Sequence, residues 1–378
     1  MASSFQSPFP LPGVKHGQRI LTSVIEARAK ANNTPAWVSV PINDQDLSQG
    51  FRDISFKELN NAANHAAHWL KQNLPPTSEP FQCFAYAGPK DLRYQILAVA
   101  AAKVQKVMVL PSPLVTAEAQ LHILEKKGCT VYLRPSSMEA PVAEILKAAP
   151  HVQTVTVPDI EAFMQEAEAE PINYSKTYEE GRADPWLVFH TSGTTGNPKP
   201  VTYTHEMMAG ADIVASLPDI GETQIHHYAQ RRCYTPLPSL HFVGMALSLS
   251  MTTFIHMTAV IGPPTPPTPS TIISLLQHGN ITTAMFPPVP NRRPNPHPRR
   301  PLRPPFPPLH PLRRRPLIPQ NRLPPTPPRP HNPRSRQHRI RRVLHRIAPI
   351  PERRMGLPHL QQAAHRGSIR TSRPRLNH

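Results

Sequence analysis

From residue 20 to residue 157, the apolar residues alternate between helical and strand-like spacing. One helix has a clear start, because Ser55 and Glu58 have the spacing of a capping box and apolar residues then recur at helical intervals towards Asn73. Another should end at Gly128, where a left-handed residue is favoured. Helices alternating with short β-branched or apolar runs predict an α/β fold with a largely parallel sheet.

The same pattern continues to residue 286. The expected helices cover residues 20–31, 55–73, 91–104, 117–127, 137–149, 242–257 and 269–277, and one more begins near His205. The expected strands are residues 36–40, 81–86, 107–110, 129–133, 152–157, 186–189, 201–204, 231–237, 259–261 and 281–286. A polar stretch at 159–183 separates the two groups of elements.

Residues 242–261 carry no formal charge and allow two interpretations, a membrane span or a buried helix that leads into a strand. The hydroxyl groups of Ser248, Ser250 and Thr252 would be costly in lipid, which favours the buried helix. We therefore expect no membrane association.

The cysteines and the N-terminus indicate the compartment. The three cysteines, Cys83, Cys129 and Cys233, lie in apolar surroundings without the spacing of metal ligands, so we expect reduced core residues and no metal site. The first residues lack a basic region followed by an apolar one, so no secretory signal is predicted. These features are typical of a cytoplasmic protein.

Composition divides the chain into two parts. Residues 287–378 contain 24 prolines and 22 arginines against one acid, Glu352. The first 286 residues carry 20 basic and 23 acidic side chains, a net charge of −3. The total of +18 therefore describes the tail, and it gives no reason to expect the body to bind nucleic acid. A segment so rich in proline cannot build helices or sheets, so we expect a disordered tail.

The most informative stretch follows the apolar run at 186–189. It reads His-Thr-Ser-Gly-Thr-Thr-Gly-Asn-Pro-Lys from His190 to Lys199. Glycines permit close approach of the backbone, successive N–H groups form an anion-binding concavity, and hydroxyls and a lysine add donors. The spacing differs from that of the kinase-type P-loop. A surface turn is the alternative, but the order and spacing of these residues favour a cradle for a nucleotide triphosphate.

This stretch resembles the phosphate-binding signature of adenylate-forming enzymes, which include acyl-CoA synthetases, luciferases and adenylation domains of peptide synthetases. Residues 238–244, Pro-Ser-Leu-His-Phe-Val-Gly, resemble a second segment of that superfamily. Residues 91–101 and 112–119 are similar to those of fungal synthetase-like reductases, such as aminoadipate and carboxylic acid reductases. The resemblance spans about residues 10–288, and it is weakened at 114–115, where Leu-Val replaces the usual arginine and asparagine.

The resemblance implies activation of a carboxylic acid by ATP and Mg²⁺ as an acyl-adenylate, which the thiol of a phosphopantetheine carrier or of CoA later captures. Lys199 would add positive charge, Thr191 would help to fix the loop, and His241 would line the adenylate and acyl pocket, although a buried core histidine is the alternative. The β- and γ-phosphates would be held by the remaining loop residues, Ser192, Gly193, Thr194, Thr195 and Gly196.

Several parts of the family pattern are missing. We find no segment with the metal-binding glutamate, no aspartate for the ribose and no C-terminal domain with its catalytic lysine, and Lys199 is the last lysine. The catalytic residues are therefore unknown, and activity should be severely impaired. We expect residues 1–286 to form an incomplete adenylate-forming N-terminal domain of mostly parallel sheets flanked by helices.

The tail at 287–378 has three interpretations. It could bind RNA or an acidic surface through its arginines, although stacking aromatics and Arg-Gly-Gly repeats are absent. It could be a proline-rich ligand for recognition domains. Its dominance by Pro, Arg, Leu, His and Gln, the amino acids of C-first codons, favours a third interpretation, translation in the wrong frame. A non-catalytic nucleotide-binding remnant or an Arg/Pro-rich interaction protein is thus the alternative to an adenylating enzyme.

Overall fold

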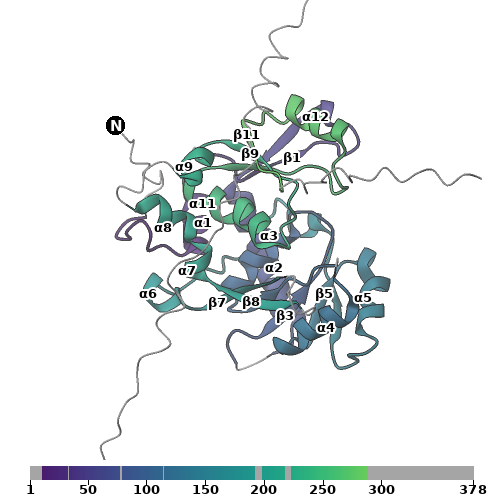
Figure 1. Cartoon of the computed structure of the whole chain (residues 1–378). Helices are drawn as coiled ribbons and strands as arrows, with labels where there is room; N and C mark the ends of the chain where they lie inside the picture. The colour runs from purple at the N-terminus through teal and green to yellow at the C-terminus, as the bar shows by residue number, and fades with distance from the viewer. Residues whose placement is uncertain are drawn as a thin grey trace, which may run out of the picture. The chain divides into compact units, whose positions relative to one another are not determined.

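The computed structural model describes residues 11–32, 34–76, 79–113, 115–191, 198–217 and 223–287. The tail beyond Pro287 and the centre of the glycine-rich loop at 192–197 lie outside the described residues. The described part of the chain forms two β-sheets with helices packed against them (Figure 1). This is the α/β architecture with mostly parallel strands that the sequence predicts.

The larger sheet has six strands in the order β6-β5-β3-β4-β7-β8. These are β3 (Cys83–Tyr86), β4 (Val107–Val109), β5 (Val131–Arg134), β6 (Gln153–Thr156), β7 (Pro185–Thr191) and β8 (Lys199–Thr204). Neighbouring strands are parallel except β7 and β8, which form an antiparallel hairpin. Parallel pairing requires crossovers, and these are supplied by α3 (Arg93–Lys103), α4 (Ala117–Lys126) and α5 (Glu139–Leu146).

The smaller sheet has five strands in the order β11-β9-β10-β1-β2. They are β1 (Val38–Pro41), β2 (Phe51–Ile54), β9 (Arg232–Tyr234), β10 (Thr258–Val260) and β11 (Thr283–Ala284). The N-terminal strand β1 pairs in parallel with β10, where Val38 lies opposite Ala259. Two regions far apart in sequence therefore build one sheet.

The helix signals in the sequence are confirmed at several ends. At the start of α2 (Phe56–Asn73), the Ser55 hydroxyl accepts from the Glu58 N–H at 3.2 Å and the Glu58 carboxylate accepts from the Ser55 N–H at 2.8 Å. Gly128, after α4, has a φ of 61°. The other helices are α1 (Leu21–Lys30), α6 (Tyr178–Gly181), α7 (His205–Met208), α8 (Gly210–Ser216), α9 (Gln224–Tyr228), α10 (Phe242–Met245), α11 (Met251–Ile255) and α12 (Pro269–His278).

The helix expected at 242–257 is less regular than its sequence suggests. A π-helical turn at Ala246–Ser250 separates α10 from α11. There the Ser248 hydroxyl donates to the Gly244 carbonyl at 2.8 Å, and such bonds to the preceding turn compete with the regular ladder. The segment is largely buried and leads into β10, as the buried-helix interpretation predicts. In the described residues, no helix has both the length and the apolar character needed to cross a membrane.

Three other expected elements were wrong in extent. The strand predicted at 231–237 is only β9, of three residues. The strand predicted at 281–286 is only β11, of two residues. The helix expected from His205 is divided into α7 and α8 at Ala209, whose ψ of 9° departs from helical geometry.

One large apolar cluster includes side chains from both sheets and from α1, α2, α3 and α11. Trp37 and Trp186 are wholly buried within it. Their indole N–H groups donate to the Ser248 and Ala98 carbonyls, each at 2.7 Å. The two largest side chains of the core are thus both packed and hydrogen-bonded, which fixes their orientation.

Buried ion pairs join elements that are distant in sequence. Arg19 and Asp212 have no exposed side-chain surface, and the Arg19 Nε lies 2.9 Å from the Asp212 Oδ2. This pair connects the segment before α1 to α8. Lys103 of α3 lies 2.8 Å from Glu26 of α1, so a second buried pair fixes α1 against α3.

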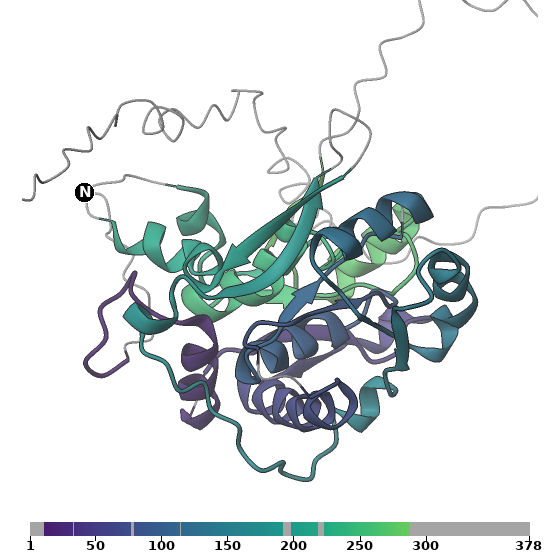
Figure 2. The ribbon, with the colours of Figure 1, turned by 90° about the horizontal axis from the view of Figure 1, so that it is seen from below.

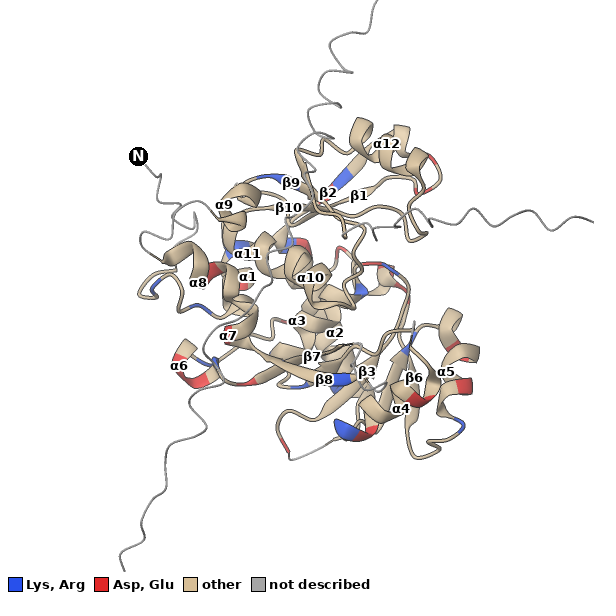
Figure 3. Cartoon of the chain, viewed as in Figure 1, with Lys and Arg blue, Asp and Glu red and all other residues tan. Residues whose placement is uncertain are grey.

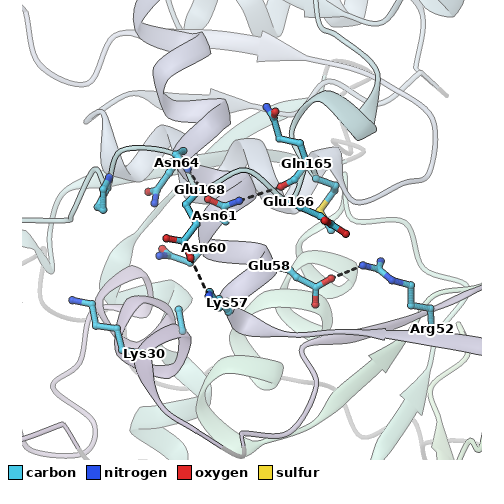
Figure 4. A pocket seen from close by; sticks show the side chains of 14 residues that line it. Lys30, Arg52, Lys57, Glu58, Asn60, Asn61, Asn64, Gln165, Glu166 and Glu168 are labelled. Atoms are coloured by element: carbon cyan, nitrogen blue, oxygen red, sulfur yellow. Dashed lines mark hydrogen bonds and ion pairs between the residues drawn. The ribbon is translucent and has the colours of Figure 1, made fainter.

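Within the polar stretch at 159–183, residues 165–170 run along α2, as Figure 4 shows, and we call this segment the strap. Asn61 donates to the Ala167 carbonyl at 3.0 Å and accepts from the Ala169 N–H at 2.9 Å. His65 and His68, one and two turns further along α2, contact backbone carbonyls of the strap at 2.8 and 2.9 Å. A polar face of α2 therefore satisfies a backbone that has no sheet partner.

Charged residues of both signs occur on the same elements, as seen around α4 and α5 in Figure 3. Glu125 and Lys126 are neighbours on α4, and Glu144 pairs with Lys147 beyond the end of α5. This mixing agrees with the small net charge of residues 1–286.

Asp212→Asn should lower the free energy of unfolding by about 3–5 kcal/mol, because it keeps the shape of the side chain but leaves Arg19 buried without its counter-charge. Urea denaturation measures this loss. Glu144→Gln is the matched control, since it breaks an ion pair whose side chains are about 70% exposed, and it should cost less than about 0.5 kcal/mol. Equal small losses in both variants would contradict a structural role for the buried pair.

Candidate functional site

The glycine-rich loop is the connection of the β7–β8 hairpin, whose strands lie side by side in Figure 2. Thr191, the last residue of β7, is paired with Lys199, the first residue of β8. The pairing continues with His190 opposite Pro200. Both ends of the segment 192–198 are therefore fixed beside each other, and the exposed side chains of Thr191 and Lys199 lie at its base.

Five of the predicted phosphate-binding residues lie outside the described residues: Ser192, Gly193, Thr194, Thr195 and Gly196. Their positions along the chain place them between two strand ends that the structure describes. Since β7 is parallel to β4, the loop leaves the carboxyl edge of the parallel strands. Ligands of open α/β sheets bind at this edge.

His190 connects the hairpin to the neighbouring strand. Its Nε2 accepts a hydrogen bond from the Ser112 N–H at 3.0 Å, just after β4. The ring is half-buried, and this burial lowers the pKa of His190, with a further lowering by the nearby His241. The accepting Nε2 requires the neutral ring with its proton on Nδ1. The sequence left the role of His190 open, and the structure shows that it links the Ser112 segment to the loop.

His241 lies immediately before α10, with an extended backbone and a half-buried side chain. Burial lowers the pKa of His241. The next residue, Phe242, stacks on Tyr203 of β8 with ring centroids 4.5 Å apart, and it meets Phe189 of β7 edge-on at 6.0 Å. These three aromatic rings hold the His241 segment against the hairpin.

Gly244 is required by close packing at the start of α10. A Cβ at this position would lie 2.2 Å from the Pro238 carbonyl oxygen and 2.9 Å from that of Leu237. Because no side chain fits at that distance, glycine allows the helix to turn back directly over residues 237–238. Close packing thus explains why a glycine occupies this position in the segment 238–244.

A small cavity lies beside this segment, and its polar groups were not predicted from the sequence. Gln95 of α3 donates through Nε2 to the Ser239 hydroxyl at 2.7 Å and to the Ser248 hydroxyl at 2.9 Å, and all three residues line the cavity. The one available signal was a buried glutamine within the apolar helix α3. The network joins the crossover helix of the larger sheet to the turn that precedes His241.

The described residues contain no ready-made metal-ion cluster. Among them, no group of three or more His, Cys, Asp or Glu side chains could hold a metal ion. A Mg²⁺ ion that accompanies a nucleotide is held by one or two carboxylates together with the phosphate oxygens.

Comparison with known proteins gives a consistent result. The family model described as AMP-binding enzyme matches residues 26–293. A carboxylic acid reductase of Neurospora crassa is 29% identical over 280 residues, which are 72% of this chain and 26% of that protein. An isocyanide synthase-NRPS hybrid of Aspergillus fumigatus is 26% identical over 66% of this chain and 16% of its own length. The chain thus spans 26% and 16% of the length of these two relatives.

Solved structures share the fold. The N-terminal domain of FACL13 from Mycobacterium tuberculosis has a TM-score of 0.56 at 20% identity, covering 70% of this chain and 62% of that one. The o-succinylbenzoate coenzyme A synthetase of Bacillus subtilis, in complex with ATP and magnesium, has a TM-score of 0.50 at 21% identity, covering 69% and 62%. At these identities the likeness concerns the fold alone.

The lowered pKa of His190 predicts how stability depends on pH. A histidine whose pKa falls below its ordinary 6.5 on folding binds fewer protons in the native state. Its contribution is therefore complete above pH 6.5 and is lost as the pH falls towards the native pKa. His190→Gln keeps an acceptor for Ser112 but does not titrate. This variant should lose less stability than the unsubstituted chain between about pH 7.5 and about pH 5.5 in urea denaturation. Identical losses would show that protonation of His190 is not coupled to folding.

Proposed function

The chain belongs to the family of AMP-binding enzymes, and we propose that its β7–β8 loop binds the phosphates of ATP for the activation of a carboxylic acid as an acyl-adenylate. The observation that carries this proposal is the pairing of Thr191 with Lys199 at the base of the glycine-rich loop. A closed loop with N–H groups, hydroxyls and a cation suits a polyphosphate.

Each site residue has a proposed role. The β- and γ-phosphates are held by Ser192, Gly193, Thr194, Thr195 and Gly196 together with their backbone N–H groups. Lys199 supplies positive charge from the start of β8, and Thr191 fixes the opposite end of the loop. His241, held to the hairpin through Phe242, lines the adenylate and acyl side of the pocket.

In the proposed reaction, a carboxylate oxygen of the substrate attacks the α-phosphorus of ATP. The bond from that phosphorus to the bridging oxygen breaks, and pyrophosphate leaves. Positioning and charge stabilisation carry most of such phosphoryl chemistry. In the intact family, the thiol of a carrier domain or of CoA then takes the acyl group and releases AMP.

The given sequence contains no segment that resembles the metal-binding glutamate motif of the family. Family enzymes use ATP with Mg²⁺, and the described residues supply no carboxylate set for the metal. We propose that residues 1–286 are part of an adenylation domain whose catalytic power is reduced while its phosphate loop is retained. The end of the family match, at residue 293, supports a boundary in this region.

Lys199→Ala should weaken ATP binding by about 10- to 100-fold, because it removes a charge-assisted contact to phosphate. Isothermal titration of the full chain with ATP measures the effect. Lys147→Ala is the matched control, since Lys147 is also an exposed lysine but lies just beyond the C-terminal end of α5. Equal ATP affinities for the two variants would show that Lys199 does not contribute to ATP binding.

Carboxylate-dependent exchange of pyrophosphate into ATP separates the two functional candidates. We expect ATP binding with little or no exchange, because residues 1–378 contain no segment like the metal-binding glutamate motif, whose carboxylate would stabilise charge in the transition state. Rapid exchange by the unsubstituted chain would contradict this expectation and would establish an active enzyme. Absence of both binding and exchange would contradict the proposal.

For the tail, we propose translation in a shifted frame after about residue 287. The arginine and proline composition changes abruptly there, in the middle of the expected domain. Sequencing the transcript through this region should reveal another frame that encodes glycine-containing, acidic family-like segments. If neither alternative frame does so, the tail belongs to the protein, and salt-sensitive RNA binding that disappears on deleting 287–378 would then assign it an interaction role.

A further inference from the structure

Two of the three cysteines lie in contact within the larger sheet. Cys83 is the first residue of β3, and Cys129 lies shortly before β5, the strand that pairs in parallel with β3. Both side chains pack in one apolar cluster, where Cys129 is buried and Cys83 is half-buried. The two thiols are free and are joined by a hydrogen bond. A pair of free thiols in contact is a candidate site of covalent modification.

The end of α4 holds the backbone of Cys129 in place. Gly128 has a φ of 61°, and its N–H donates to the Glu125 carbonyl at 3.1 Å. The Cys129 N–H donates to the Leu124 carbonyl at 2.9 Å. These two bonds form the Schellman motif, in which a left-handed residue reverses the chain after a helix. The position of Cys129 is therefore set by the helix end and does not depend on its contact with Cys83.

The surroundings of the two thiols differ, and this gives them different roles. The hydrogen bond from the Cys129 thiol lowers the pKa of Cys83 against the opposing effect of burial, and the charge of Lys127 lowers it further. The same hydrogen bond and burial raise the pKa of Cys129. The Lys127 ammonium donates to the uncharged Thr202 hydroxyl at 2.6 Å, which does not neutralise its charge. Cys83 is thus the more acidic and the more accessible thiol, as a nucleophile requires.

Cys233 differs from this pair in each respect. It lies in β9 of the smaller sheet and is only 1% exposed. Its sulfur contacts the Tyr234 carbonyl at 3.8 Å, and among the described residues it contacts no other thiol. Burial raises the pKa of Cys233 to about 12. The chain thus contains an unreactive cysteine of its own for comparison.

We propose that Cys83 and Cys129 form a dithiol site that hydrogen peroxide converts to a disulfide. The Cys83 thiolate attacks one peroxide oxygen, the O–O bond breaks, and the departing hydroxide takes up the proton that Cys83 released. The Cys129 sulfur then attacks the sulfur of the Cys83 sulfenic acid, the S–O bond breaks, and a second water leaves as the S–S bond forms. The two thiols together lose two electrons, and one peroxide molecule is reduced to two waters.

This dithiol is separate from the proposed ATP site. Cys83 and Cys129 lie at the amino ends of β3 and β5, whereas the glycine-rich loop follows the carboxyl end of β7. Because β3, β4, β5 and β7 are parallel, these are opposite edges of the larger sheet. Formation of the disulfide therefore does not require a bound nucleotide.

Peptide mapping of the full chain without reductant tests the proposal, after brief treatment of the reduced protein with hydrogen peroxide and alkylation of the remaining thiols. We expect one linked pair of peptides, containing Cys83 and Cys129, that lacks two hydrogens and separates on reduction with dithiothreitol. In Cys129→Ser, the sulfenic acid of Cys83 has no thiol to attack it, so dimedone should trap it. In Cys83→Ser, Cys129 should react with peroxide at least about tenfold more slowly than Cys83 does in Cys129→Ser.

Cys233→Ser is the matched control and should leave the yield of linked peptides unchanged. The peptides report the disulfide directly, so a failure of ATP binding would leave this test intact. Absence of the linked pair in the folded chain, or its appearance only after unfolding in urea, would overturn the inference. Equal trapping of Cys83 by dimedone in Cys129→Ser and in the unsubstituted chain would overturn it as well, because Cys129 would then not resolve the sulfenic acid.

Discussion

The pairing of Thr191 with Lys199 is the constraint on which the proposed site depends. It closes the segment 192–198 between two strand ends, one of which also continues the parallel sheet through β4. The pairing gives the glycine-rich segment a defined base at both of its ends. Its ends need no further ordering when a phosphate binds, which reduces the entropic cost of binding.

The rest of the site is positioned by packing against that hairpin. Phe242 stacks on Tyr203, and His190 accepts a hydrogen bond from the Ser112 N–H. Gln95 connects the same region to α3 through two serine hydroxyls. Further away, the buried Arg19–Asp212 pair fixes α8, which follows the hairpin in the chain. The desolvation of two buried charges offsets much of their attraction, so the loss of one partner is costly even where the pair itself adds little net stability.

The sequence was sufficient for features that depend on local chemistry. The capping box at Ser55, the left-handed Gly128 and the alternation of helices with strands all follow from short-range preferences, and the structure confirms them. The two-sheet arrangement was not predicted, because it pairs β1 with β10 across more than 200 residues. The π-helical turn and the aromatic contacts of Phe242 were not predicted from the sequence either, because they depend on residues that are neighbours only in space. The roles of Ser192 to Gly196 stay predictions.

Hydrogen–deuterium exchange of the full chain with and without ATP tests whether the β7–β8 hairpin binds the nucleotide. We expect peptides covering residues 189–200 and 237–245 to become protected together, because the hairpin and the His241 segment are joined through Phe189, Tyr203 and Phe242. Unchanged exchange in the loop peptide at saturating ATP would contradict the claim that this hairpin binds the nucleotide.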